Sequence, residues 1–157
     1  MSDQVDESGI RRAVPADAPI LTALTERSGL VWGYPPDFFD WAPGANTMST
    51  DDIRHSPVFL LEERGRILGF YSLSGQPPQL TMEKLFVEPD RIGTGCGRRL
   101  WQHAVETARQ FGADALVLDA DPHAAPFYRA MGAEYIGEKT TPKPDWTLHS
   151  FRYDLGT

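Results

Sequence analysis

Three glycines stand in alternate positions in the stretch EPDRIGTGCGRRLW, which runs from Glu88 to Trp101. The β-rich run QLTMEKLFVEP leads into this stretch, and an amphipathic run follows it. Glycine at this density weakens any regular element, because glycine loses more conformational freedom on folding than any other residue. The order of strand, glycine-rich turn and helix therefore indicates a fold in which the backbone at a helix N-terminus is exposed to a ligand.

The run after the glycines predicts an amphipathic helix that opens near Gly95. Gly112 comes directly after the apolar stripe and is expected to end the helix. The apolar residues recur at i, i+1, i+4, i+5, i+8 and i+11, which is one stripe of a helix with a period of 3.6 residues; they are Leu100, Trp101, Ala104, Val105, Ala108 and Phe111.

The rest of the chain alternates between strand-like and helix-like segments. We therefore expect an α/β fold with a mixed sheet and helices on its faces. In chain order the other predicted elements are a strand at 9–14, a helix from 15 that stops at Gly29, a second short helix from Pro35, a hairpin that turns at 63–65, a strand at 79–89, a strand at 115–120 buried on both faces, a helix closed by Gly132, and two final strands.

Length and composition fit one domain in a reducing compartment. Of the 157 residues, we expect 1–8 to be disordered and 9–157 to form a single domain. The single cysteine, Cys96, excludes an internal disulfide. The acidic start MSDQVDESG is unlike a signal peptide, and no apolar run approaches the roughly 18 residues of a membrane span. We therefore expect a cytoplasmic protein.

The formal net charge of −7 at pH 7 limits the class of partner. It argues against sequence-independent binding to nucleic acid, which requires a basic face. The acidic balance either serves solubility or favours cationic substrates such as amines. The four histidines are scattered along the chain without metal-ligand spacing, so we expect no metal site.

A glycine-rich turn that opens a helix is suited to binding anions. The first backbone N–H groups of a helix have no internal partners, and the helix dipole adds positive potential there. Glycines let a phosphate approach this backbone closely. Arg91, Arg98 and Arg99 add positive charge around the turn. The alternative for the loop taken alone is a glycine-rich turn that holds no ligand.

The spacing of the glycines excludes two common phosphate-binding motifs. A P-loop needs a Lys-Ser/Thr pair after its last glycine, and Arg98-Arg99 stand there instead. A dinucleotide fingerprint reads G-x-G-x-x-G in a parallel unit near the first strand, whereas this chain has G-x-G-x-G after several antiparallel strands.

Two segments in order resemble the motifs of the GCN5-related N-acetyltransferase (GNAT) superfamily. LFVEPDRIGTGCGRRL resembles its cofactor-binding motif, in which a strand, a Gly-x-Gly loop and a helix hold the pyrophosphate of acetyl-CoA. DADPHAAPFYRAMGA resembles its second motif, Asn-x-x-Ala…Tyr…Gly. The resemblance covers nearly the whole chain. It implies the single-domain acyl-CoA N-acyltransferase fold, whose central sheet is mainly antiparallel and flanked by helices.

The resemblance also implies which residues contact the cofactor. The chain departs from the motif at Ile92, where Gln or Arg is common, and at Asp121, where the motif has Asn. Asp121 can still cap the following helix, and Ile92 would contribute mainly its backbone N–H. The implied cofactor-binding residues are Phe86, Val87, Ile92, Gly93, Thr94, Gly95, Cys96, Gly97, Arg98, Asp121, Ala124, Phe127 and Tyr128.

Two residues are predicted to be catalytic. By resemblance, Tyr128 lies near the sulfur and protonates the departing thiolate, a task that a phenol can perform; alternatively, Tyr128 only packs with Phe127 and Met131. Glu83 is the candidate general base, because period-2 alternation places it on the same face of its strand as Leu85 and Val87. The further candidates for the base are Glu88 and Glu134.

The aromatic stretch LVWGYPPDFFDW is the candidate acceptor site. Trp32 and Tyr34 could contact an amine or its apolar tail, whereas Phe38 and Phe39 fit the core of a small helix pair. Cys96 is expected to be a small apolar filler rather than a nucleophile, since it would lie beside the pyrophosphate and far from the acyl group.

The resemblance thus implies an acetyl-CoA-dependent N-acetyltransferase, an acyltransferase that moves an acetyl group to a primary amine of a small molecule without a covalent enzyme intermediate. Acetyl-CoA would be the co-substrate, and a homodimer is compatible with the fold. The alternatives are an acyl-CoA sensor or partner-binding module with weak catalysis on the same fold, and acetylation of a protein N-terminus or lysine.

Overall fold

The structure is a computed structural model that describes residues 9–31, 48–140 and 147–156. These residues form one seven-stranded sheet with the strand order β1-β2-β3-β4-β5-β7-β6. Neighbouring strands are antiparallel except β4 and β5, which run parallel, so the predicted mixed and mainly antiparallel sheet is confirmed. The strands are β1 (Ile10–Arg12), β2 (Val58–Glu63), β3 (Arg66–Gln76), β4 (Gln79–Val87), β5 (Ala115–Ala120), β6 (Glu134–Lys139) and β7 (Leu148–Asp154).

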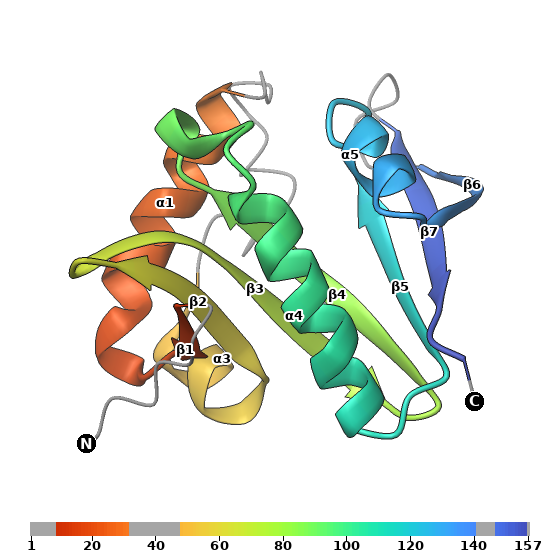
Figure 1. The fold of residues 1–157 in the computed structure, drawn as a ribbon, viewed down its shortest axis with the longest axis horizontal. Coiled ribbons are helices and arrows are strands. Elements are labelled where there is room, and N and C mark those ends of the chain that lie inside the picture. The colour runs from red at the N-terminus through yellow and green to blue at the C-terminus, as the bar shows by residue number, and fades with distance from the viewer. Residues whose placement is uncertain (1–8, 32–47, 141–146, 157) are drawn as a thin grey trace.

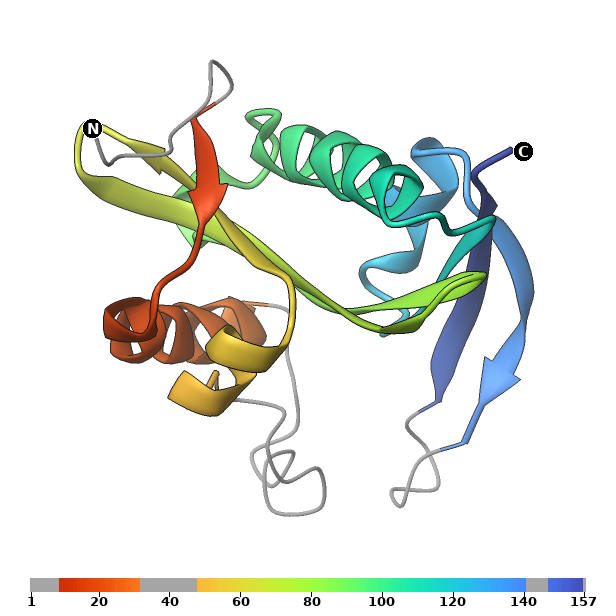
Figure 2. The same ribbon diagram turned by 90° about the horizontal axis from the view of Figure 1, so that it is seen from below.

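Helices cover both faces of the sheet (Figure 2). One face packs against α1 (Ala18–Val31) and α3 (Thr50–His55), and the other packs against α4 (Cys96–Gln110) and α5 (Ala125–Ala130). Two short 3-10 helices, η1 (Pro15–Asp17) and η2 (Pro89–Arg91), precede α1 and the glycine-rich loop. In the part of the chain that the structure describes, no helix has the length and apolar character needed to cross a membrane.

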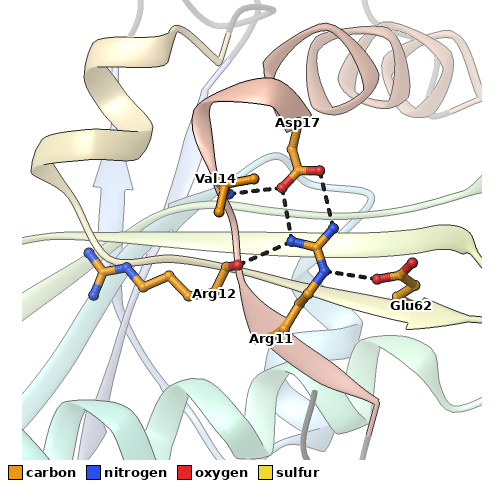
Figure 3. Close-up of polar contacts among 5 residues, drawn as sticks. All are labelled: Arg11, Arg12, Val14, Asp17 and Glu62. Carbon is orange, nitrogen blue, oxygen red and sulfur yellow. Dashed lines mark hydrogen bonds and ion pairs between the residues drawn. The ribbon is translucent and has the colours of Figure 1, made fainter. Parts of the chain in front are cut away.

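The start of α1 is held against the sheet by a buried carboxylate (Figure 3). Asp17 in η1 accepts hydrogen bonds from both terminal nitrogens of Arg11, at 3.0 and 3.1 Å, and from the backbone N–H of Val14 at 2.8 Å. Arg11 on β1 also donates to Glu62 on β2 at 2.8 Å. These bonds connect two strands to the turn that begins α1, and they raise the pKa of the Arg11 guanidinium.

Gly69 on β3 lets α4 approach the sheet closely. A Cβ atom at this position would lie 2.7 Å from the carbonyl oxygen of Phe86 and 2.9 Å from Cδ1 of Leu100. Both distances are shorter than real contacts permit. The backbone oxygen of Phe86 on β4 cannot shift easily, so the pairing with β4 requires glycine, and the missing side chain also leaves room for Leu100 of α4. This packing fixes the N-terminal end of α4 beside the end of β4.

β4 and β5 pair at only one end. Their ladder consists of Gln79 with Ala115, Leu80 with Leu116 and Thr81 with Val117, and no further pair follows within the described residues. Figure 1 shows the two strands diverging beyond this point, with α4 on one side of the opening and α5 on the other. The sheet is therefore split toward the end of β4 that leads into the glycine-rich loop.

Four predicted details differ from the structure. Gly29 does not end α1, which continues to Val31, and α3 was not predicted. Phe111 is 43% exposed and lies outside the apolar stripe of α4. β5 is buried along one face, whereas the other face changes from the buried Ala115 to the exposed Asp119. The predicted helix from Pro35 lies outside the described residues.

Candidate acetyl-CoA site

A cleft of about 420 Å³ lies where β4 ends and the glycine-rich loop begins. Its wall comes from three parts of the chain that are distant in sequence: the last turns of α1, the segment from β4 into α4, and α5. The lining residues are Ser28, Leu85, Phe86, Val87, Arg91, Ile92, Gly93, Gly95, Gly97, Arg98, Ala124, Phe127, Tyr128, Ala130 and Met131. The cleft thus borders Leu85 to Val87, the part of β4 that has no ladder partner from β5 within the described residues.

The glycine-rich loop presents open backbone to this cleft. Gly93 has φ 84° and Gly95 has φ 95°, a left-handed conformation that other residues rarely adopt. Apart from its neighbours in the chain, no described residue lies within 4 Å of a Cβ atom built on either glycine. Gly95 is the N-cap of α4, so the unpaired N–H groups of the first helical turn are beside this open space. The predicted opening of the helix near Gly95 is confirmed.

The charge at this end of the cleft is positive. Arg91 and Arg98 both contribute to the wall, and they add to the positive potential of the α4 N-terminus. Arg99, the third arginine of the predicted group, is absent from the wall and donates instead to Glu63 at 3.1 Å. An anion is therefore the ligand that this end of the cleft favours.

Gly97 sets the distance between α4 and α5. A Cβ atom at Gly97 would lie 3.2 Å from the ring of Phe127, closer than nearly all such contacts. The glycine therefore lets Phe127 stand against the first turn of α4 while forming part of the cleft wall. The third glycine of the loop has a packing role, whereas the first two leave space for a ligand.

Tyr128 both packs in the core and borders the cleft. It is 6% exposed, and its ring centroid lies 5.7 Å from that of Trp101 and 5.0 Å from that of Phe127. Burial raises the pKa of its hydroxyl above the usual value, and the negative charge of Asp121 raises it further. The hydroxyl is therefore protonated at neutral pH. The ring of Tyr128 therefore packs in the core, as the alternative to a catalytic role predicted. The catalytic role of its hydroxyl stays a prediction.

Asp121 organises the turn before α5. Its Oδ1 accepts hydrogen bonds from the backbone N–H groups of His123, at 2.8 Å, and Ala124, at 3.1 Å. Asp at this position of the second motif therefore still supplies the acceptor that orders the turn. Asp121 is absent from the cleft wall.

The predicted placement of Glu83 is wrong, because a bulge interrupts the β3–β4 ladder. Ser72 pairs with Lys84 and Leu73 pairs with Met82, which leaves Glu83 as the extra residue of β4. The bulge reverses the alternation, so Glu83 faces away from Leu85 and Val87, which pack on the α4 side. Its Oε2 accepts a hydrogen bond from Ser74 Oγ at 2.5 Å, in a second, polar cavity of about 240 Å³.

The second cavity lies on the face of the sheet that α3 covers. Its lining includes Asp52 of α3, the buried Ser72 of β3 and, on β4, both Glu83 and Lys84. Glu83 is thus separated from the cleft wall that holds Tyr128. The two residues predicted to be catalytic stand on opposite sides of the sheet, and the role of Glu83 as a base stays a prediction.

Most of the implied cofactor-binding residues come together in the cleft wall. Thr94 and Cys96 do not line it. The hydroxyl of Thr94 donates to the carbonyl oxygen of Arg91 at 2.6 Å and so closes the turn. Cys96 is 4% exposed in the core, as expected for an apolar filler. Trp32 and Tyr34, the predicted acceptor residues, lie outside the described residues.

The cleft also contains residues that the sequence did not indicate. Ser28 reaches it from the last turns of α1, and Ala130 and Met131 reach it from the end of α5. Arg27, next to Ser28, forms a bidentate ion pair with Glu88, whose carboxylate is buried at the end of β4. No local pattern predicts that α1 meets β4, because this contact joins residues about sixty positions apart.

The residues present fit coenzyme A. The open glycines and two arginines suit its phosphates, and the apolar wall of Leu85, Val87 and Phe127 suits the thin pantetheine arm. Over residues 9–31, 48–140 and 147–156, no three His, Cys, Asp or Glu side chains are grouped so that they could hold a metal ion.

Comparison with curated proteins shows related acetyltransferases. The chain is 32% identical over 131 residues to the streptothricin acetyltransferase of Streptomyces lavendulae, a match that covers 80% of the chain and 63% of that protein. It is 35% identical over 77 residues to the peptidyl-lysine N-acetyltransferase YjaB of Escherichia coli (strain K12), which covers 49% of the chain and 48% of that protein. The match therefore spans less than two thirds of either relative.

Comparison with solved structures and with family models agrees with this. A protein of the GNAT family from Desulfovibrio desulfuricans superposes with a TM-score of 0.77 at 20% sequence identity, over 94% of this chain and 98% of that chain, which confirms the predicted fold. The model of the Acetyltransferase (GNAT) family matches residues 27–133, well over half of the sequence. The chain therefore belongs to the GNAT acetyltransferase family.

Proposed function

We propose that the protein is an acetyl-CoA-dependent N-acetyltransferase that acts on the primary amine of a small molecule. The observation that carries this proposal is the cleft itself. It connects the open N-terminus of α4, at Gly93 and Gly95, to the split edge of β4 and to Tyr128. An anion site at one end and a buried hydroxyl farther along the wall match a ligand with a phosphate end and a reactive end.

The chain holds such a ligand with backbone groups at both ends. The N–H groups of the loop and first turn of α4, with Arg91 and Arg98, bind the phosphates. Beyond Thr81, β4 has no ladder partner on the side of β5 within the described residues. An amide-bearing arm can pair there with the backbone of Leu85 to Val87, as a peptide does when it adds to a sheet edge.

The transfer needs an activated carbonyl and a stabilised leaving group. Bound acetyl-CoA supplies a thioester. A neutral amine attacks its carbonyl carbon, the C–N bond forms as the C–S bond breaks, coenzyme A departs as a thiolate, and the surplus proton on the new amide nitrogen passes to solvent. A backbone N–H near Phe86 polarises the carbonyl oxygen. Tyr128 donates a hydrogen bond to the sulfur. Its raised pKa favours this donation over complete proton transfer.

The acceptor amine must lose a proton before it attacks. Glu83 is the proposed base, and its position on the α3 side of the sheet implies that the amine arrives from that side, opposite α4. Because Glu83 and Tyr128 lie on different faces, the base and the acid act on opposite sides of β4. The two carboxylates of this cavity, Asp52 and Glu83, outnumber its one ammonium group, Lys84, and this balance favours a cationic acceptor.

The proposal is tested by measuring free-thiol release from acetyl-CoA with a panel of acceptors. The panel contains streptothricin, small primary amines, amino acids and lysine-containing peptides, because relatives are named for streptothricin and for peptidyl-lysine. We expect release with at least one small amine and acetylation of that amine by mass spectrometry. Thiol release only with peptides would contradict a small-molecule acceptor and support acetylation of proteins instead. Tight acetyl-CoA binding without release from any acceptor would support the sensor instead.

A further inference from the structure

Ser28 on α1 carries a buried hydroxyl with no hydrogen-bond partner among the described residues. The residue is 1% exposed. A serine inside a helix commonly donates its hydroxyl to the carbonyl oxygen four residues earlier. Thr25, one turn before it on the same helix, does so, with its Oγ1 2.9 Å from the carbonyl oxygen of Leu21. Ser28 therefore differs from its nearest equivalent in the same helix.

The position of Ser28 explains what the hydroxyl could contact. Ser28 forms part of the wall of the cleft, together with Leu85, Phe86 and Val87 of β4. The neighbouring ion pair between Arg27 and Glu88 fixes this part of α1 against the end of β4. A rotation between staggered χ1 positions is enough to turn the hydroxyl toward a ligand.

An unpaired buried hydroxyl lowers the stability of the free protein. The group loses its hydrogen bonds to water on folding and gains none from the chain, whereas an alanine at the same position would avoid this loss. Native proteins contain few such groups. A ligand that supplies the missing partner would regain the lost interaction on binding, which links the hydroxyl to occupancy of the cleft.

We propose that the Ser28 hydroxyl hydrogen-bonds the pantetheine arm of coenzyme A. This inference rests on the proposed function. The phosphates have their own partners at Gly93, Gly95, Arg91 and Arg98, whereas the arm lies along β4, where Ser28 meets the cleft. The arm contains amides that both donate and accept, and a serine hydroxyl can do either. Ser28 would thus be a positioning residue for the arm.

The test compares two ligands by calorimetry on wild type and Ser28→Ala. Coenzyme A contains the arm, and adenosine 3′,5′-bisphosphate is its nucleotide half without the arm. We expect Ser28→Ala to weaken coenzyme A binding about fivefold to tenfold, the effect of one net hydrogen bond, and to leave the affinity for adenosine 3′,5′-bisphosphate unchanged. We also expect the ligand-free variant to unfold at the same temperature as wild type or at a higher one.

Thr25→Val is the matched control, because it removes a buried hydroxyl from the same helix that does not line the cleft. It should leave both affinities unchanged. Equal binding of coenzyme A by wild type and Ser28→Ala would overturn the inference alone, as would an equal loss of affinity for both ligands. A lower unfolding temperature of ligand-free Ser28→Ala would show that the hydroxyl stabilises the free protein, and this would also overturn the inference. Failure of wild type to bind coenzyme A would overturn the proposed function as well.

Discussion

At the start of α1, Asp17 accepts three hydrogen bonds from Arg11 and Val14, whereas near the end of the same helix the Ser28 hydroxyl has no partner among the described residues. Both groups are buried, but only Asp17 connects its end of the helix to a neighbouring strand. They differ in what lies beside them. Asp17 is enclosed by β1 and η1, as Figure 3 shows, and Ser28 belongs to the wall of a cleft.

This difference in hydrogen bonding distinguishes buried polar groups that stabilise the fold from buried polar groups that can bind a ligand. A buried carboxylate needs a partner within the chain, because an unpaired buried charge strongly destabilises the folded state. A single neutral hydroxyl costs much less, so the folded chain tolerates it without a partner. Substitutions at the start of α1 should therefore change the stability of the protein. Substitutions in the cleft should change ligand affinity or turnover.

The largest effect is expected on the ligand side, from Gly95→Val. The left-handed φ of 95° strains any β-branched residue, and the new side chain would fill space that is open for the ligand. We expect coenzyme A affinity to fall by at least about 1000-fold, roughly 4 kcal/mol, as measured by calorimetry on folded protein. Gly112→Val is the control, since Gly112 has a similar φ of 88° at the far end of α4; it should lose stability but bind normally. Unchanged binding by Gly95→Val would exclude the loop as a phosphate site.

The second effect is expected on the stability side, from Asp17→Ala. Removing this carboxylate leaves Arg11 with Glu62 as its one carboxylate partner among the described residues, and it takes away the acceptor of the Val14 N–H. We expect a loss of about 3 kcal/mol in the free energy of unfolding, with the melting temperature about 10 °C lower. Asp51→Ala removes an exposed i,i+3 pair with Arg54 and should change stability by less than about 0.5 kcal/mol. If Asp17→Ala weakened coenzyme A binding without loss of stability, the division of roles along α1 would be wrong.

A smaller effect, confined to turnover, is expected from Tyr128→Phe. The substitution keeps the ring contacts with Trp101 and Phe127 and removes only the hydroxyl. With a responsive acceptor, kcat should fall roughly tenfold to 100-fold, and coenzyme A affinity should change by less than about twofold. Tyr135→Phe, on the half-exposed edge strand β6, should leave kcat unchanged. A large loss of affinity in Tyr128→Phe would make this tyrosine a binding residue.

The smallest effect concerns alkaline pH. The pKa of Tyr128 is higher in the folded than in the unfolded chain, so its contribution to stability is complete below about pH 10 and is lost as the pH rises above that value. Between pH 9 and pH 11, wild type should lose about 1 kcal/mol more of its free energy of unfolding than Tyr128→Phe does. Urea unfolding at these pH values measures the difference. Parallel decline of the two proteins would show that the hydroxyl is not buried as described.

Local signals in the sequence predicted much of the fold and the anion end of the site. The glycine spacing and the apolar stripe were enough to place the opening of α4 at Gly95, because both depend only on neighbouring residues. The stop at Gly29 failed for a physical reason, since a glycine inside a helix costs only about 1 kcal/mol. A usable signal for α3 was present, because Ser49 and Asp52 bond each other's backbone N–H as a capping box.

The parts of the site that depend on pairing between distant segments could not be predicted. The bulge that turns Glu83 to the other face depends on how β3 and β4 align across the ladder, and alternation along one strand cannot reveal it. The position of Ser28 depends on the docking of α1 against β4, which the Arg27–Glu88 pair reports only once the structure is known. Sequence periodicity shows which face a residue occupies only while the ladder stays regular.

The short parallel ladder between β4 and β5 has a mechanical consequence. Among the described residues, the ladder between strands β1 to β4 and strands β5 to β7 consists of three pairs, made by Gln79, Leu80 and Thr81 at one corner of the sheet. Any bending of the sheet concentrates at this corner, so a small rotation of one half about it changes the width of the opening at the far end. A molecule that lies in the opening and contacts both β1 to β4 and β5 to β7 would limit this rotation and make the sheet more rigid while it is bound.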